Sequence, residues 1–292
     1  MILKYLQLIR VHQWVKNIFV FVPILFSLHI FEEDYLLTTI FAFFVFCLAS
    51  SAIYVINDLV DIDADRSHPL KKNRTLPSGA ISKSAALITA IVLLIIVTWL
   101  IFYFNYEFIL TVVSFIILNV LYSLLLKNIV ILDIFSIAAG FALRVLAGAF
   151  VIQVPISSWL LLTTMFISLF LGVMKRHSEL SIISTENNTS SRKVLSQYSL
   201  NFADQIATVA AAGVIICYAL YSVAPRTISV FNTEGLIYTT PFVVFGIFRY
   251  MYLEYMSKKG ENTTRIMATD IPMIVTIVLY IVTTVLIVYK IL

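Results

Sequence analysis

Long apolar stretches fill most of this chain, and short polar segments separate them. A helix needs about 20 apolar residues to cross a bilayer, and nine stretches reach or approach that length. The pattern therefore predicts an all-α polytopic membrane protein with nine transmembrane helices. The predicted spans cover residues 17–31, 35–56, 84–106, 108–126, 130–152, 156–174, 205–225, 236–256 and 271–289.

The composition agrees with this pattern. Hydrophobic residues make up 61% of the chain, charged residues only 12%, and the mean hydropathy is +0.98. Such values are typical of membrane proteins and argue against a soluble core. We therefore predict a single transmembrane domain over residues 1–292, with the lipid bilayer as its surroundings. The sequence leaves the oligomeric state open.

The basic residues predict the orientation of these helices. If the N-terminus is cytoplasmic, sixteen of the twenty basic residues fall in cytoplasmic segments, as the positive-inside rule requires. We therefore expect a multi-pass protein of the cell (inner) membrane with a cytoplasmic N-terminus. The net charge of +4 follows from this topology and needs no nucleic acid as a partner.

Two long polar connections lie on the predicted cytoplasmic side. They cover residues 57–83, after the second span, and 175–204, after the sixth. We expect both to be loops that cap an active site.

The first connection opens with a cluster of carboxylates. If the second helix continues past Asn57, then Asp58, Asp61 and Asp65 lie on one face, at i, i+3 and i+7. Carboxylates on one stripe repel each other unless a cation joins them. Mg²⁺ suits such a position, because it takes one or two carboxylates and completes its shell with water and substrate phosphate.

Basic residues follow the carboxylates in the same connection. Arg66, Lys71 and Arg74 could contact phosphate beside the metal, which together would make a diphosphate site. The alternative is an ordinary solvated loop, in which acids cap a helix and bases obey the positive-inside rule.

A second polar constellation begins where the sixth span is expected to end. Lys175 and Arg176 could contact phosphate, and Glu179 could hold a metal or orient a cation. The alternative is a basic cytoplasmic end of a helix. We expect His177 to be a solvated neighbour.

Arg144 lies inside the fifth span, roughly 16 Å along the helix from Asp133. A buried arginine at this depth costs at least ~2.5 kcal/mol unless a partner offsets it. It could belong to an internal ion pair, or line a cavity that reaches a phosphate. The small residues Gly140 and Gly148 predict close helix packing around it. For the similar Arg249, we expect Glu254 to offset the charge.

These residues together resemble the UbiA-type intramembrane prenyltransferase superfamily. The resemblance rests on the pattern N-D-x-x-D-x-x-x-D, formed by Asn57, Asp58, Asp61 and Asp65 after the second span. It implies a UbiA-like helical bundle with a cytoplasm-facing pocket, in which Mg²⁺ on the aspartates holds a diphosphate.

Four further segments are similar to those of decaprenyl-phosphate phosphoribosyltransferases, a subgroup of that superfamily. They cover residues 10–17, 65–71, 143–148 and 175–180. The resemblance implies a pentosyltransferase of the cell envelope, which moves 5-phosphoribose from phosphoribosyl pyrophosphate to a polyprenyl phosphate and releases pyrophosphate.

The same resemblance implies a role for each candidate residue. Asp58, Asp61 and Asp65 would ligate Mg²⁺ and act in catalysis, with Asn57 beside them. Arg144 is a further catalytic candidate, and Arg144 and Lys16 would hold the lipid phosphate. The remaining substrate-binding candidates are Arg66, Lys71, Arg74, Lys175, Arg176 and Glu179.

Two other functions remain open at this point. The first keeps the fold and transfers a prenyl group from a prenyl diphosphate to an aromatic or other acceptor. Typical prenyltransferases carry a second aspartate motif after the sixth helix, whereas this chain has Lys175, Arg176 and a single Glu179 there. The second alternative is a secondary transporter of an anionic solute, since charges inside helices are compatible with transport.

Overall fold

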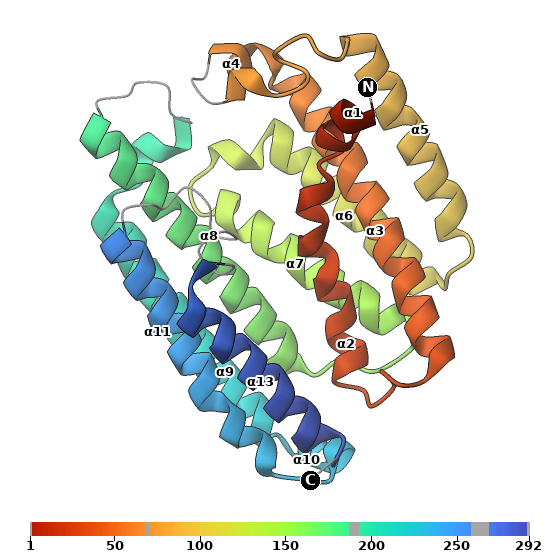
Figure 1. Cartoon of the computed structure of the whole chain (residues 1–292), viewed down its shortest axis with the longest axis vertical. Coiled ribbons are helices and arrows are strands. Elements are labelled where there is room, and N and C mark those ends of the chain that lie inside the picture. The colour runs from red at the N-terminus through yellow and green to blue at the C-terminus, as the bar shows by residue number, and fades with distance from the viewer. Residues whose placement is uncertain (1, 68–70, 187–192, 258–268, 291–292) are drawn as a thin grey trace. The chain divides into compact units, whose positions relative to one another are not determined.

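The computed structural model describes residues 2–67, 71–186, 193–257 and 269–290. It divides into two compact units, each described separately below. Unit 1 comprises Met1–Leu25, His29–Lys127 and Gly140–Pro155; unit 2 comprises Phe26–Leu28, Asn128–Ala139 and Ile156–Leu292. Within the described ranges every regular element is a helix, which confirms the predicted all-α class (Figure 1).

Eight helices are long and apolar enough to cross a membrane, and a bent N-terminal pair raises the number to nine among the described residues. That pair joins Ile2–Leu8 to Val11–Leu25 through a bend of 50°. The prediction of nine spans is thus confirmed in outline. Of the first predicted span, 17–31, only the first part is helical: residues 17–21 belong to the 3-10 helix Val11–Phe21 and residues 22–25 to a short α-helix that ends at Leu25.

Unit 1 contains the N-terminal helices and the first long spans (Figure 1). Its core gathers large side chains such as Phe46, Phe108 and Phe115. The longest helix of the unit packs mainly against α5. Its elements are α1 (Ile2–Leu8), η1 (Val11–Phe21), α2 (Val22–Leu25), α3 (Glu33–Val60), α4 (Ile62–Ser67), η2 (Lys71–Asn73), α5 (Lys83–Ile101), α6 (Tyr106–Leu124) and the second part of α7 (Leu132–Val151).

Side-chain caps fix where two of these helices begin. Ser82 accepts a hydrogen bond from the Ala85 amide at the start of α5, and Asn105 accepts one from the Phe108 amide at the start of α6. Each cap satisfies an amide that has no partner inside the helix.

Gly148 allows α7 and η1 to approach closely within unit 1. A side chain at this position would collide with the backbone carbonyl of Val20. The close packing predicted from the small residues around Arg144 is therefore confirmed at Gly148.

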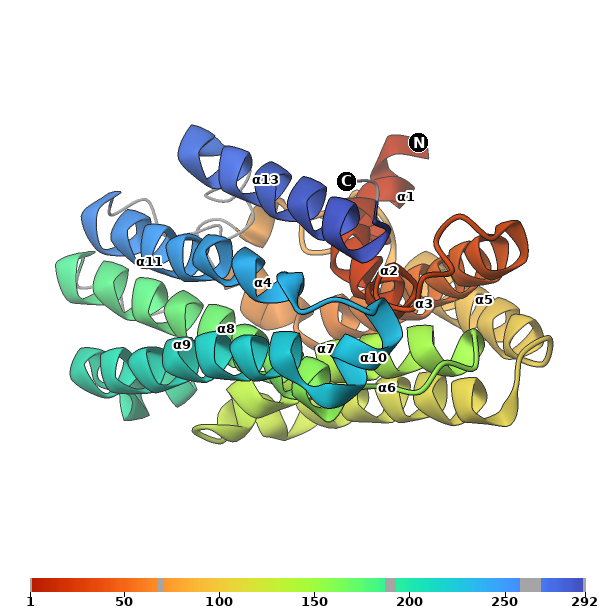
Figure 2. The ribbon, with the colours of Figure 1, turned by 90° about the horizontal axis from the view of Figure 1, so that it is seen from below.

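Unit 2 is built around the pair α8 (Ser158–Glu186) and α9 (Leu200–Val223), which lie side by side in Figure 2 and have the most extensive contact of any helix pair. Phe170, Met174 and Tyr250 are among its buried core residues. The other elements are the first part of α7, η4 (Lys193–Gln197), α10 (Pro225–Phe231), η5 (Gly235–Thr239), α11 (Thr240–Ser257) and α13 (Ile271–Val288).

One boundary was predicted wrongly. The sequence places a loop from residue 175 onward, but α8 continues to Glu186. Hydropathy falls after residue 174, and this fall marks the end of the apolar stretch rather than the end of the helix. Lys175, Arg176 and Glu179 are therefore helical residues. The connection over 57–83 also contains helical turns, α4 and η2.

Candidate functional site

The acidic motif lies where α3 ends and α4 begins, all within unit 1. Asp61 interrupts the helix, yet its amide donates to the Asn57 carbonyl at 2.9 Å, and the Asp65 amide donates to the Asp61 carbonyl at 2.8 Å. The helical register therefore continues across the break. Asp58 and Asp65 are separated by two helical turns and lie on the same side.

A small apolar cluster anchors this segment. Ile62 and Leu76 are buried in one cluster with Leu8 and Val55. Burial of a side chain of this size contributes about 1.5–3 kcal/mol. Ile62 follows the acidic motif and Leu76 follows η2, so their shared cluster holds the two segments together. Arg74, two residues before Leu76, therefore lies near the acidic motif.

Arg74 contacts two carboxylates of the motif. Its Nη1 donates to Asp65 Oδ2 at 2.7 Å and lies 3.5 Å from Asp58 Oδ1. Both carboxylates are buried, with 3% of Asp58 and 4% of Asp65 exposed. Arg10 from the N-terminal segment also donates to Asp58 Oδ1. Burial of a charged carboxylate costs free energy, and these guanidinium groups offset that cost.

Asp61 has a different partner. Its Oδ1 accepts a hydrogen bond from Lys127 Nζ at 2.7 Å, and its side chain is 41% exposed. Asn57, at the start of the motif, accepts a hydrogen bond from the hydroxyl of Ser123. The predicted stripe of three carboxylates thus becomes a pair, Asp58 and Asp65, with Asp61 facing Lys127.

The acidic motif offers carboxylate oxygens, the ligands that Mg²⁺ prefers. Among the residues that the structure describes, no group of three or more histidine, cysteine or acidic side chains is arranged to hold a metal. Two carboxylates do converge, since Asp58 and Asp65 both face the Nη1 of Arg74. Mg²⁺ commonly takes one or two carboxylates and fills its remaining positions with water and phosphate. The donor set therefore fits a metal that arrives with a diphosphate.

Arg66, in the same connection, contacts other groups than Asp58, Asp61 and Asp65. Arg66 contacts the Pro77 carbonyl at 3.4 Å and Asp63 at 3.5 Å, and its side chain is half exposed. The side chain of Lys71 and all of His68 lie outside the described part of the chain.

Arg10 contacts the acidic motif, a contact that sequence reasoning missed. It belongs to residues 10–17, the N-terminal segment that resembles the phosphoribosyltransferases. The signal that could have found it is the position of Asp58, in the last turn of a spanning helix, where a carboxylate requires a cationic partner.

The second constellation forms a buried network within unit 2. Arg176 is 1% exposed, and its Nε donates to Asp133 Oδ2 at 2.8 Å. Its Nη1 donates to Glu179 Oε2 at 2.5 Å. Tyr198 donates to Asp133 Oδ1 at 2.8 Å and accepts from the Ile131 amide at 2.8 Å. Burial raises the pKa of the Tyr198 hydroxyl.

This network changes the interpretation of two predicted site residues. The guanidinium of Arg176 is enclosed by protein carboxylates, and Glu179 is one of them, which favours a structural role for both. Lys175, by contrast, is exposed. His177 lies 3.3 Å from Asp204 and packs edge-to-face on Tyr255, so it is more enclosed than the solvated neighbour that was predicted.

Arg144 is buried within unit 1. Its Nε donates to Asn17 Oδ1 at 2.7 Å and its Nη1 to the Gly140 carbonyl at 2.9 Å. The rings of Phe115 and Phe141 lie 4.6 Å and 5.2 Å from the guanidinium carbon. In the described ranges no carboxylate pairs with Arg144. Amide, carbonyl and aromatic groups therefore replace the internal ion pair that was one of the two predictions.

Asn17, the partner of Arg144 in η1, makes further hydrogen bonds, and Lys16 lies next to it in the chain. Asn17 Oδ1 also accepts from Ser50 at 3.3 Å, and its amide donates to Cys47 Sγ at 3.3 Å. The preceding residue, Lys16, is partly buried. The amide of Asn17 thus links η1 to both α3 and α7.

The partner predicted for Arg249 was wrong. Arg249 forms two hydrogen bonds with Asp270, at 3.1 Å and 2.8 Å, rather than pairing with Glu254. Five positions along a helix place two side chains on different faces, so Glu254 cannot face Arg249.

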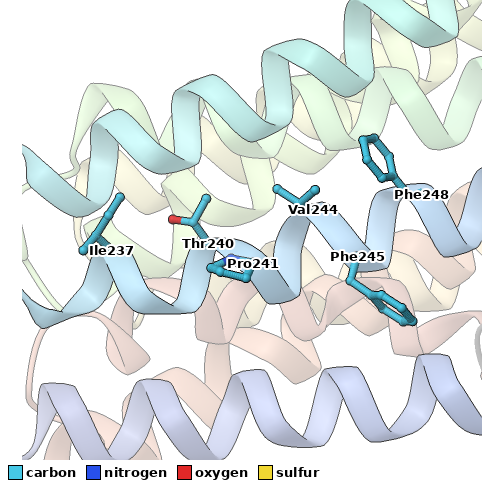
Figure 3. Close-up of a pocket in the computed structure, with 6 residues that line it drawn as sticks. All are labelled: Ile237, Thr240, Pro241, Val244, Phe245 and Phe248. Atoms are coloured by element: carbon cyan, nitrogen blue, oxygen red, sulfur yellow. The ribbon is translucent and has the colours of Figure 1, made fainter.

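An apolar pocket lies along α11 and η5 in unit 2 (Figure 3). Its lining contains no charged group, so it does not supply phosphate or metal contacts. It is lined by Ile237, Thr240, Pro241, Val244, Phe245 and Phe248.

The fold and the site define a class: a helical, multi-span membrane protein with a carboxylate and guanidinium site at the end of a spanning helix. Residues 19–269 match the UbiA prenyltransferase family. The chain belongs to this family and is a transferase of the UbiA superfamily.

Characterised relatives agree with this membership. The chain is 33% identical over 225 residues to the decaprenyl-phosphate phosphoribosyltransferase of Mycolicibacterium smegmatis, covering 74% of this chain and 69% of the relative. It is 32% identical over 218 residues to that of Mycobacterium tuberculosis, covering 73% and 72%. Nodulation protein NoeC of Azorhizobium caulinodans is 31% identical over 180 residues, covering 61% and 58%.

Solved structures share the fold. A UbiA homologue from Archaeoglobus fulgidus, bound to GPP and Mg²⁺, has a TM-score of 0.73 at 18% identity, covering 98% of this chain and 99% of that one. A digeranylgeranylglyceryl phosphate synthase structure has a TM-score of 0.69 at 20% identity, covering 99% of each chain. The predicted UbiA-like fold is thus confirmed.

Proposed function

We propose that this protein transfers 5-phosphoribose from phosphoribosyl pyrophosphate to a polyprenyl phosphate and releases pyrophosphate. The observation that carries this proposal is the similarity to decaprenyl-phosphate phosphoribosyltransferases, at 32–33% identity over nearly three quarters of the chain. Membership of a transferase family disfavours the transporter alternative.

The donor diphosphate is proposed to bind at the acidic motif. Asp58 and Asp65 would hold Mg²⁺, and Asp61 and Asn57 would complete the surrounding polar shell. When bound, the metal would neutralise charge that builds on the departing pyrophosphate. Arg74, which contacts both carboxylates, would donate to the same phosphate oxygens.

Other basic residues keep the roles predicted from the sequence. Arg66 and Lys71 are proposed donor contacts from the same connection, and Lys175 is proposed from α8. Arg176 and Glu179 were predicted to meet the donor as well. We now assign them to positioning, because they bond to each other and to Asp133.

The acceptor phosphate is proposed to be held by Lys16, with Arg144 nearby in a supporting role. Lys16 is the stronger candidate, since two nitrogens of Arg144 already donate to Asn17 and Gly140. An acceptor oxygen would form a bond to the anomeric carbon of ribose. The bond from that carbon to pyrophosphate would break, and the electron pair would leave with pyrophosphate.

This reaction needs no strong general base in the protein, because a phosphate monoester is already an anion at neutral pH. The water-soluble donor suits a site on the cytoplasmic side. We therefore retain the proposal of an inner-membrane protein with a cytoplasmic N-terminus, which the distribution of basic residues supports.

A donor competition assay tests the choice between phosphoribosyl and prenyl transfer. The purified protein would be digested by limited proteolysis in the presence of Mg²⁺ and either phosphoribosyl pyrophosphate or geranyl diphosphate. The rate of cleavage reports which donor binds. We expect phosphoribosyl pyrophosphate to slow cleavage at concentrations where geranyl diphosphate does not. Protection by geranyl diphosphate alone would support the prenyltransferase alternative instead.

A further inference from the structure

Four charged side chains of unit 1 form an alternating arrangement at the end of α3. Arg10 contacts Asp58, Asp58 contacts Arg74, and Arg74 contacts Asp65. The two carboxylates are almost fully buried, whereas the arginine side chains are 20% and 37% exposed. Among these four side chains, two positive charges face two negative charges.

This balance has a consequence for metal binding. A divalent cation that enters alone adds two positive charges beside two guanidinium groups. Repulsion between like charges at close range is strong where the surroundings exclude water. A diphosphate removes this obstacle, since it brings negative charge to the metal and to both guanidinium groups at once.

The backbone at Arg10 is held in an uncommon conformation. Arg10 has φ 53° and ψ 50°, the left-handed conformation that residues with a side chain rarely adopt. Such a conformation persists where the surrounding structure enforces it, and it is frequent at ligand-binding positions.

The residues on either side of Arg10 provide that enforcement. The hydroxyl of Ser51 donates to the Ile9 carbonyl at 2.8 Å and accepts from Trp14 Nε1 at 3.0 Å. The guanidinium of Arg10 also lies 5.2 Å from the centre of the Tyr54 ring. These hydrogen bonds hold the N-terminal segment against α3, where Arg10 forms its ion pair with Asp58.

We propose that Arg10 is a built-in counter-cation that couples metal binding to diphosphate binding. While the site holds no metal–diphosphate, Arg10 occupies the carboxylate of Asp58 and disfavours a metal ion alone. When metal and diphosphate arrive together, Arg10 turns from Asp58 to the phosphate oxygens. The inference rests on the proposed function only in assuming a substrate that carries a diphosphate.

The test uses the full-length protein in detergent, Mn²⁺ as the metal and pyrophosphate as the diphosphate. Electron paramagnetic resonance of free Mn²⁺ measures the affinity for metal alone. Equilibrium dialysis of labelled pyrophosphate, with and without saturating Mn²⁺, measures the affinity for the pair. Neither readout requires turnover, ribose or a prenyl chain, so its failure is distinguishable from failure of the proposed function.

The informative variant is Arg10→Asn, since asparagine tolerates the left-handed backbone but carries no charge. We expect tighter binding of Mn²⁺ alone and weaker binding of pyrophosphate in the presence of Mn²⁺. Each change should be on the order of tenfold, within the usual range of coupling between sites. Lys4→Gln, which removes an exposed charge from the same segment, should change neither.

Opposite shifts are the signature of coupling, because general damage to the site weakens both ligands together. Shifts of the same sign, or no shift, in Arg10→Asn would overturn the proposal. The wild-type protein provides a second test that is independent of any variant's folding. If it binds Mn²⁺ alone so tightly that pyrophosphate adds nothing, Arg10 does not act as a counter-cation.

Discussion

Arg144 donates a hydrogen bond from Nε to Asn17 Oδ1 over 2.7 Å, and this contact joins α7 to η1 inside unit 1. A buried guanidinium that is bound by an amide instead of a carboxylate is sensitive to loss of either partner. Hydrogen bonds to charged groups contribute about 1.5–3 kcal/mol.

We therefore predict that Arg144→Met and Asn17→Leu each lower the thermal unfolding temperature of the purified protein. In the double variant the two losses should not add, because both remove the same contact. A double-mutant cycle on unfolding free energies measures this. Strictly additive losses would show that the two side chains act independently.

The carboxylates of the acidic motif should differ in importance for catalysis. Asp58→Asn and Asp65→Asn each remove one of the two carboxylates that converge on Arg74, and we expect losses in kcat on the order of 10²–10³-fold. Asp63→Asn is the matched control, because Asp63 belongs to the same segment but is 83% exposed. Initial rates at saturating substrate measure the effect. An Asp63→Asn loss as large as that of Asp65→Asn would contradict the assignment.

Arg176 and Lys175 are neighbours in sequence with different expected roles. Arg176→Met leaves Asp133 buried without its cation, and removal of one member of a buried pair costs about 3–5 kcal/mol. We expect the variant to unfold at a clearly lower temperature. Lys175→Gln should instead raise the KM for phosphoribosyl pyrophosphate, on the order of tenfold, with unchanged unfolding.

The opposite result would contradict these assignments: a raised donor KM in Arg176→Met and a lowered unfolding temperature in Lys175→Gln. A stable Arg176→Met protein with a raised donor KM would return Arg176 to the phosphate contacts that were first predicted from the sequence. Unfolding curves and donor KM values measured on the same preparations distinguish the two outcomes.

The fold was predictable to the extent that it depends on local properties. Hydropathy placed nearly all the spans, and the spacing of Asp58 and Asp65 placed them on one side of a helix. Partners distant in sequence were not predictable in this way. Arg10 meets Asp58 only because the N-terminal segment folds back onto α3. Counting basic residues by the positive-inside rule treats each one as solvated, and Arg176 is an exception that only the packing of α8 reveals.

The ion pair between Arg249 and Asp270 makes the free energy of unfolding depend on pH. The hydrogen bonds from Arg249 lower the pKa of Asp270 below the ordinary aspartate value of about 3.9. A carboxylate with a lowered pKa in the folded state stabilises the protein above its unfolded pKa. That stabilisation is lost as the pH falls through the folded pKa.

Asp270→Asn should therefore be less stable than wild type near neutral pH, with a difference that shrinks as the pH falls below about 4. Asparagine can still cap α13, so the variant tests the charge rather than the cap. Thermal unfolding across this pH range measures the difference. A difference that stays constant with pH would show that the pair contributes no pH-dependent stability.

The central claim is that this chain makes lipid-linked phosphoribose. The most direct measurement incubates purified protein with Mg²⁺, phosphoribosyl pyrophosphate and a polyprenyl phosphate, and analyses the lipid fraction by mass spectrometry. The account predicts a polyprenyl-phosphate phosphoribose product, together with pyrophosphate release that Asp65→Asn slows on the order of 10²–10³-fold. Absence of that product, with a prenylated acceptor formed from a prenyl diphosphate under the same conditions, would contradict it.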